Sequence, residues 1–235
     1  MKDNDELEDG VARAVQKAVE AKRGRGRPAR LSRESIVDAG LALLEAAPDE
    51  PLTLLRIARE VDAVPAALYR HVGSLDQLLD GVLARVLEDM RFEIRTRASW
   101  RSQVRDWMRC MRAHLLRYPG VVRLIGRRGR TSPAWFDAMS VLLEILERTG
   151  LRGAPLARAY LWIAETTMGV VVNEATVPFD EQIAAALRAL DGMSEEARRR
   201  HAPLSSHLSA IDAGGFFDLV ADRTVAAIAD LVEKG

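Results

Sequence analysis

The chain has a single cysteine, Cys110, among its 235 residues. A lone cysteine cannot form an internal disulfide, which fits a reducing compartment, and we find no base partnered with it for nucleophilic chemistry. Long apolar runs are missing too: no stretch reaches the roughly 18 apolar residues that span a bilayer, so we expect no membrane partner. Residues 1–30 are charged and lack the apolar core of a secretion signal, which predicts a cytoplasmic protein.

Aromatic residues make up only 5% of the chain, and strand-like alternation of apolar and polar residues is absent. These features predict an all-α fold. The motifs of common enzymes are also missing: there is no glycine-rich phosphate loop after a strand, no HExxH and no spacing that indicates a Ser/His/Asp triad. His201 and His207 do not match a zinc spacing. We therefore expect that the protein is not an enzyme, and that it has no catalytic residues, no cofactor and no metal site.

Positive and negative residues balance, with 34 of each, so the net charge is zero. The two signs are nevertheless segregated near the N-terminus. Residues 1–9 hold five acids and one lysine, whereas residues 22–33 hold six basic residues and no acid. A local basic segment of this kind indicates a nucleic-acid partner, which the average conceals.

The clearest pattern lies between residues 53 and 79, where two short helices are separated by a tight turn. Thr53 can cap the first helix, and Pro65 suits the first position of the second, where its missing N–H costs nothing. Apolar residues of the second helix face the first and leave residues 64–67 pointing outward. An ordinary helical hairpin has the same periodicity, but a helix-turn-helix would place this outward end against base edges in the major groove.

The identities of the amino acids in and around this segment are more specific evidence than its helical periodicity. An amphipathic helix precedes LTLLRIARE, the second helix reads ALYRHV, and the next begins Ser-x-Asp-x-Leu-Leu. With these motifs, the chain from about Ser32 to Leu87 resembles the TetR family of bacterial transcriptional repressors. The resemblance implies a homodimer that places two such motifs in successive major grooves of double-stranded operator DNA. Two positions depart from the family: Leu75 stands where a lysine is frequent, and Asp62 where glycine is common.

The resemblance also implies roles for the residues of the motif. Thr53, Tyr69 and His71 would contact phosphates, and Arg70 offers a further donor. The residues expected to face bases are all apolar, namely Val64, Pro65, Ala66 and Ala67. Such side chains donate no hydrogen bonds and can only touch thymine methyl groups. Sequence discrimination must therefore come partly from elsewhere.

Two further sources of discrimination are expected. Arg56, on the first helix of the motif, would reach a guanine or a phosphate. Arg25 and Arg27 lie in an Arg-Gly-Arg-Pro segment that resembles the core of an AT-hook, in which arginines enter a narrow minor groove. A flexible basic tail without groove contacts is the alternative for this arm.

Three parts follow from these signals. Residues 1–31 form a flexible extension with the basic arm, residues 32–80 a three-helix helix-turn-helix domain, and residues 81–235 a helical domain for effector binding and dimerisation. Helices are expected near 33–47, 75–94, 99–117, 120–126, 132–149, 153–176 and 215–233, with 177–211 read as a loop carrying one or two short helices. By analogy with the family, the helices near 153–176 and 215–233 pair with their copies across the dimer.

From about residue 90 onward, the order and spacing of the helices resemble the ligand-binding and dimerisation half of the family, most nearly its tetracycline-repressor-like branch. This resemblance implies that an unknown small-molecule effector binds in the second domain. The side chains expected around its pocket are Trp107, Met111, His114, Met139, Trp162, Thr166 and Asn173. Methionine and tryptophan at helical spacing are more often core than ligand contacts, and His114 fits either a pocket donor or a satisfied core group. The function expected is a repressor released by its effector. A ligand-responsive activator, an architectural DNA-binding protein and an all-α enzyme with an incidental helix-turn-helix remain alternatives.

Overall fold

The computed structural model describes residues 31–126 and 132–233 in full, and the backbone of residues 127 and 128. The expectations for Arg25, Arg27 and the rest of residues 1–30 lie outside this part of the chain. Within it, all regular structure is helical, which confirms the all-α fold. No helix in these residues is long and apolar enough to cross a membrane.

The first four described helices are α2 (Arg33–Ala46), α3 (Leu54–Glu60), α4 (Pro65–Val72) and α5 (Leu75–Glu88). The remainder are α6 (Trp100–Leu115), α7 (Pro119–Arg128), α8 (Pro133–Glu147), α9 (Gly153–Thr176), α10 (Phe179–Asp191), α11 (Glu195–Leu208) and α12 (Ala213–Glu233). Local chemistry sets several of their starts. Ser32, Ser74 and Ser132 each accept a backbone N–H of the first turn that has no partner within the helix.

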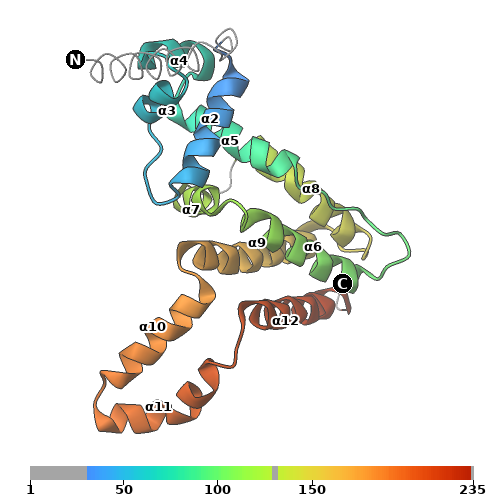
Figure 1. Ribbon diagram of the computed structural model, residues 1–235. Coiled ribbons are helices and arrows are strands. Elements are labelled where there is room, and N and C mark those ends of the chain that lie inside the picture. Colours follow the sequence, from blue (N-terminus) through green and yellow to red (C-terminus); the bar gives the residue numbers. More distant parts are fainter. Residues whose placement is uncertain (1–30, 129–131, 234–235) are drawn as a thin grey trace, which may run out of the picture.

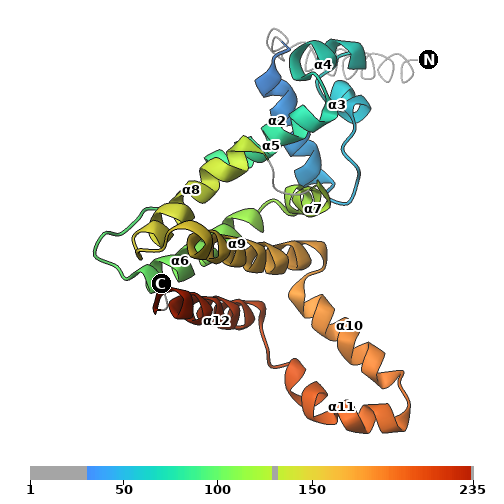
Figure 2. The ribbon, with the colours of Figure 1, turned by 180° about the vertical axis from the view of Figure 1, so that it is seen from behind.

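The helices form a small bundle joined to a larger one (Figure 1). The small bundle contains α2, α3 and α4, and α5 runs from it along α8 into the larger bundle. There α6 packs against α8, α9 and α12, and α9 lies beside α12. The hairpin of α10 and α11 projects away from the rest of the chain in both views (Figures 1 and 2). The boundary expected at residue 80 therefore falls inside α5.

The helix expected over 75–94 is shorter than predicted, since α5 ends at Glu88. Met90, Phe92 and Ile94 are half-buried, while the residues between them are exposed. This is the two-residue alternation of an extended segment. Met90 and Ile94 also continue the helical spacing of α5, so the apolar pattern fits both conformations.

Residues 177–211 were expected to be mainly loop, and this expectation is wrong. The helices α10 and α11 occupy most of the segment. Pro178 is the N-cap of α10 and Gly192 its C-cap, so these residues bound a helix instead of indicating a loop. Pro203 lies inside α11.

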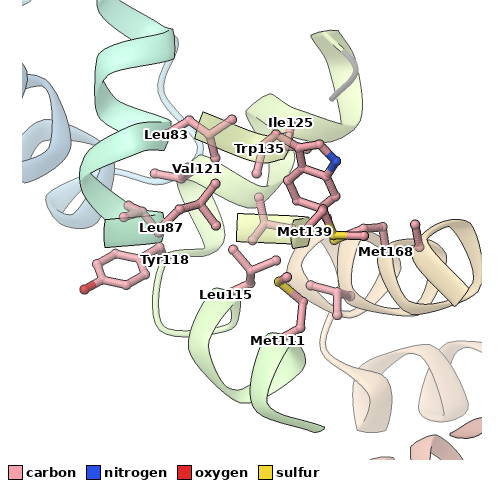
Figure 3. Close-up of a cluster of buried hydrophobic side chains, with 14 of the residues drawn as sticks. Leu83, Leu87, Met111, Leu115, Tyr118, Val121, Ile125, Trp135, Met139 and Met168 are labelled. Atoms are coloured by element: carbon pink, nitrogen blue, oxygen red, sulfur yellow. The ribbon is translucent and has the colours of Figure 1, made fainter. Parts of the chain in front are cut away.

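The core of the larger bundle is built from α5, α6, α7, α8, α9 and α12. Figure 3 shows Leu83 of α5, Met111 of α6, Ile125 of α7 and Met139 of α8 turned toward one another. Each of these side chains is at most 7% exposed. The same core thus holds both the end of α5 and the helices of the second half.

Candidate nucleic-acid interface and second-domain site

Local interactions shape the helix-turn-helix. The hydroxyl of Thr53 accepts the backbone N–H of Arg56 at 3.3 Å and caps α3. Asp62 turns the chain with a φ of 51°, a left-handed conformation that aspartate tolerates better than most residues. Pro65 begins α4. The cap, the left-handed residue and the proline together produce the short turn that the sequence predicted.

Burial divides α4 into an inner and an outer side. Leu68 is 0% exposed and faces the core. On the outer side Val64 is 64% exposed and Ala66 is exposed as well, while Pro65 and Ala67 are half-buried. We call residues 64–67 the apolar tip of α4.

Polar side chains follow the apolar tip. Tyr69, Arg70 and His71 are all exposed, and Arg70 and His71 stand in the last turn of α4. Their accessibility permits the phosphate contacts that the resemblance implies. Thr53 is exposed too, although its hydroxyl also caps α3.

Arg56 is engaged within the small bundle. Its Nη1 donates to the carbonyl oxygen of Pro51 at 2.8 Å, and its Nη2 lies 3.0 Å from the carboxylate of Glu50. These bonds fix the α2–α3 connection and leave the Arg56 side chain only 22% exposed. The expected contact of Arg56 with a base or phosphate would require them to break.

Leu55 is an exposed apolar residue that the sequence reading passed over. It lies on α3 and is 51% exposed, whereas Ile57 and Ala58 of the same helix are buried. Its position outside the inward-facing stripe was a usable signal, because an apolar side chain there has no core to enter. Leu55 therefore joins Val64 and Ala66 as an exposed apolar side chain of the motif.

Four of the seven expected effector contacts lie in the core of the larger bundle. Trp107, Met111 and His114 come from α6 and Met139 from α8, and none is more than 7% exposed. Among the residues that the structure describes, the buried indole N–H of Trp107 has no hydrogen-bond partner. Leaving such a donor unpaired typically costs about 1–3 kcal/mol.

The contacts of His114 are those of a satisfied core residue. Its Nε2 lies 2.7 Å from the carbonyl oxygen of Val86, and its ring stands 5.6 Å from that of Tyr118. Because a carbonyl oxygen only accepts, this ring nitrogen carries the proton. Val86 belongs to the end of α5, so the bond ties α6 to the helix that leads to the DNA-binding motif.

The other three expected effector contacts lie apart from this core. Trp162 is 54% exposed and Thr166 half-buried, and both line a surface hollow of ≈ 780 Å³ between α9 and α12. Asn173 is exposed and donates to Gln182 at 2.8 Å. Their placement differs from the expectation because α9 is apolar on more than one face, and spacing alone does not tell which face turns inward.

A further connection between the two bundles runs through α7. A Cβ atom at Gly120 would lie only 2.6 Å from the carbonyl oxygen of Leu44 in α2, so glycine permits this close approach. On another side, α7 packs against α9. Arg123 of α7 also pairs with Asp49, which follows α2. The helix α7 therefore contacts both α9 of the larger bundle and α2 of the small bundle.

Comparison with known proteins gives a consistent result. The tetracyclin repressor-like, C-terminal domain family matches residues 95–215. An HTH-type transcriptional regulator of Saccharopolyspora erythraea is 26% identical over 145 residues, which are 62% of this chain and 61% of that protein. The chain thus spans less than two thirds of the length of this relative.

Two solved structures share the fold. The TetR family protein ActR of Streptomyces coelicolor, in complex with (S)-DNPA, has a TM-score of 0.71 and 22% identity and covers 86% of this chain and 98% of its own. BioQ with its double-stranded DNA operator has a TM-score of 0.57 and 23% identity, covering 77% of this chain and 100% of its own. Since the family match extends over about half of the chain and follows an exposed helix-turn-helix, the protein belongs to the TetR family of transcriptional regulators.

Proposed function

We propose that the protein is a homodimeric repressor, released from a pseudo-palindromic operator by a small-molecule effector. The observation that carries this proposal is the outward-facing first turn of α4 within a helix-turn-helix of a TetR-family chain. BioQ, of the same fold, is seen with operator DNA, and ActR with a small molecule. Residues 32–80 and 81–235 would be the DNA-binding and the effector-binding parts.

Dimerisation through α9 and α12 is supported by their exposed apolar side chains. Leu161 and Trp162 of α9 are 55% and 54% exposed and border the hollow that Leu231 of α12 also lines. Pairing with the same surface of a second chain would bury them in a four-helix bundle. Two α4 helices would then enter major grooves about 34–36 Å apart, one turn of the duplex.

The proposed effector site is the region around Trp107, Met111, His114 and Met139. The unpaired indole N–H of Trp107 supports this assignment, because a ligand with a hydrogen-bond acceptor would satisfy it. An effector bound here would contact α6 and α8. The first is tied to α5 by His114, and the second packs along α5.

Effector binding would act on DNA binding by favouring one orientation of the two motifs. Such coupling is reciprocal, so operator DNA must weaken effector affinity by the same factor. Equal affinity for an effector with and without operator would contradict the mechanism. The Trp107→Phe variant removes the unpaired donor and keeps a smaller aromatic ring at this position. It should weaken the effector response while leaving operator affinity intact, and circular dichroism checks that the smaller ring leaves the fold unchanged.

The DNA-binding proposal is tested by selecting ligands from random duplexes with the purified full-length protein. We expect an inverted repeat with half-sites one helical turn apart and an affinity that falls steeply with salt. Arg70→Ala should reduce the slope of log K against log salt by about 1 per subunit. Arg188→Ala, an exposed arginine of α10, is the matched control and should leave it unchanged. Absence of salt-sensitive retention of any duplex would refute the proposal.

The dimer proposal has a separate test. Trp162→Glu should shift the protein toward monomer in sedimentation experiments, because it places a charge in the proposed interface. Leu204→Glu is the control, since Leu204 is equally exposed, at 54%, but lies on α11. A Trp162→Glu protein that remains dimeric with native helicity would contradict the assignment of this surface.

A further inference from the structure

The apolar tip of α4 lacks a side chain that can form hydrogen bonds. Its most accessible members are Val64, 64% exposed, and Ala66. On α3 the exposed side chain that follows the cap is Leu55, which is also apolar. The part of the motif that meets base edges in a helix-turn-helix is therefore hydrophobic.

Arg56 was the residue of this motif expected to supply a polar base contact. Its guanidinium is already bound to Pro51 and Glu50, in an arrangement that stabilises the α2–α3 connection. On α4 itself the polar side chains, beginning with Tyr69, lie more than a full turn beyond Val64. Base recognition by the first turn of α4 is thus left to apolar contact.

The major groove offers one apolar feature, the 5-methyl group of thymine; the other base-edge groups there are hydrogen-bond donors and acceptors. An apolar tip gains nothing from those groups, and it desolvates them without replacing their lost water contacts. It gains most where a methyl group projects toward it. The chemistry of the tip therefore selects methyl-bearing positions.

We propose that this protein reads its operator through thymine methyl groups, contacted in each half-site by Val64 and Ala66. The inference rests on the proposed function and specifies its DNA ligand: half-sites with thymine opposite the start of α4, where 5-methylcytosine also satisfies the contact. Burying one methyl group is worth about 0.8 kcal/mol, or about a fourfold change in affinity. Loss of one methyl in both half-sites should lower affinity by about 15-fold.

The test uses a duplex selected by the full-length protein, with single thymines replaced by deoxyuridine. Deoxyuridine keeps every hydrogen-bonding group of thymine and lacks only the methyl. At one or two half-site positions we expect about a fourfold loss per replacement, and at thymines outside the half-sites no loss. At those positions 5-methylcytosine opposite guanine should bind more tightly than cytosine.

A paired protein variant assigns the contact. We call the loss of affinity caused by a thymine-to-deoxyuridine replacement the deoxyuridine penalty. Val64→Ala should reduce this penalty at the one position that Val64 contacts, because the variant no longer has the side chain that touches the methyl group. At all other positions the penalty should be unchanged. Val177→Ala, at the far end of α9 with Val177 39% exposed, should leave every penalty unchanged. Circular dichroism of both variants checks that the fold is retained.

The outcomes separate this inference from the proposed function. If no duplex is retained, DNA binding itself is refuted. If a duplex is selected and binds equally well with deoxyuridine throughout its half-sites, the protein is a DNA-binding regulator but methyl reading is wrong. A penalty that Val64→Ala leaves unaltered at every position would also overturn the assignment to the apolar tip.

Discussion

The ion pair between Arg112 and Glu174 should be one of the strongest single polar contributions to stability in the larger bundle. Arg112 Nε and Nη2 donate to the two carboxylate oxygens of Glu174 at 2.8 and 2.6 Å, in a bidentate arrangement. The side chains are only 20% and 15% exposed, and the guanidinium stands 5.1 Å from the ring centroid of Phe217. The pair therefore joins α6 to α9 and touches α12.

Its magnitude follows from burial and geometry. Removing one partner of a fully buried ion pair costs about 3–5 kcal/mol, because the other charge is left without compensation. Here partial exposure lets water reach the remaining charge, so we expect about 2–3 kcal/mol for Arg112→Gln or Glu174→Gln. The coupling energy between the two substitutions should be about 1–2 kcal/mol, as for other well-formed charged pairs.

The assay is a double-mutant cycle measured by urea unfolding at pH 7. One protein concentration is used throughout, because the stability of the proposed dimer would depend on concentration. Arg199 and Glu195 of α11 provide a matched pair of the same residue types, 3.9 Å apart but 74% and 75% exposed. Their coupling should be about 0.3–0.5 kcal/mol. A coupling for Arg112 and Glu174 no larger than this would refute the reasoning from burial.

Three other predictions follow from single contacts. Gly120→Ala should lower the free energy of unfolding by about 1–3 kcal/mol, because its Cβ would lie 2.6 Å from the Leu44 carbonyl oxygen; unchanged stability in urea would contradict this close approach. The hydrogen bond from Arg109 holds the pKa of Asp218 below its ordinary value of 3.8. The pair therefore stabilises the fold above that pH and loses the effect as pH falls below it, so Asp218→Asn should flatten the acid limb of the stability curve slightly. Burial raises the pKa of the Cys110 thiol, so its alkylation at pH 7 should be slower in the folded protein than in urea; equal rates would count against burial.

The sequence predicted the helix-turn-helix almost to the residue, because its boundaries depend on local chemistry. Thr53 caps α3, Pro65 starts α4, and Asp62 accepts the left-handed turn between them. Each of these effects needs only neighbours along the chain. The same holds for Ser132 at the start of α8.

The role of Arg56 was not predictable in this way. Its partners Glu50 and Pro51 come from an irregular connection whose path the sequence leaves open. The end of α5 was missed for a different reason: Met90 and Ile94 satisfy the helical period and the extended alternation alike. Only packing against the rest of the core decides between the two.

The candidate effector residues also divide into those whose position the sequence indicated and those whose position depends on packing. Trp107 and Met139 lie on inward faces of their helices, whereas Trp162 lies on the outer face of α9. A helix with apolar residues on several sides does not reveal which side meets its own chain.

The hairpin of α10 and α11 has few tertiary contacts that stabilise it. Neither helix contains a buried residue, and the two pack mainly on each other. Segments of this kind open locally at a small fraction of the free energy of global unfolding. Backbone amides there should therefore exchange with deuterium long before those of α9 or α12, and a protease should nick the bend around Gly192 while the two bundles stay intact.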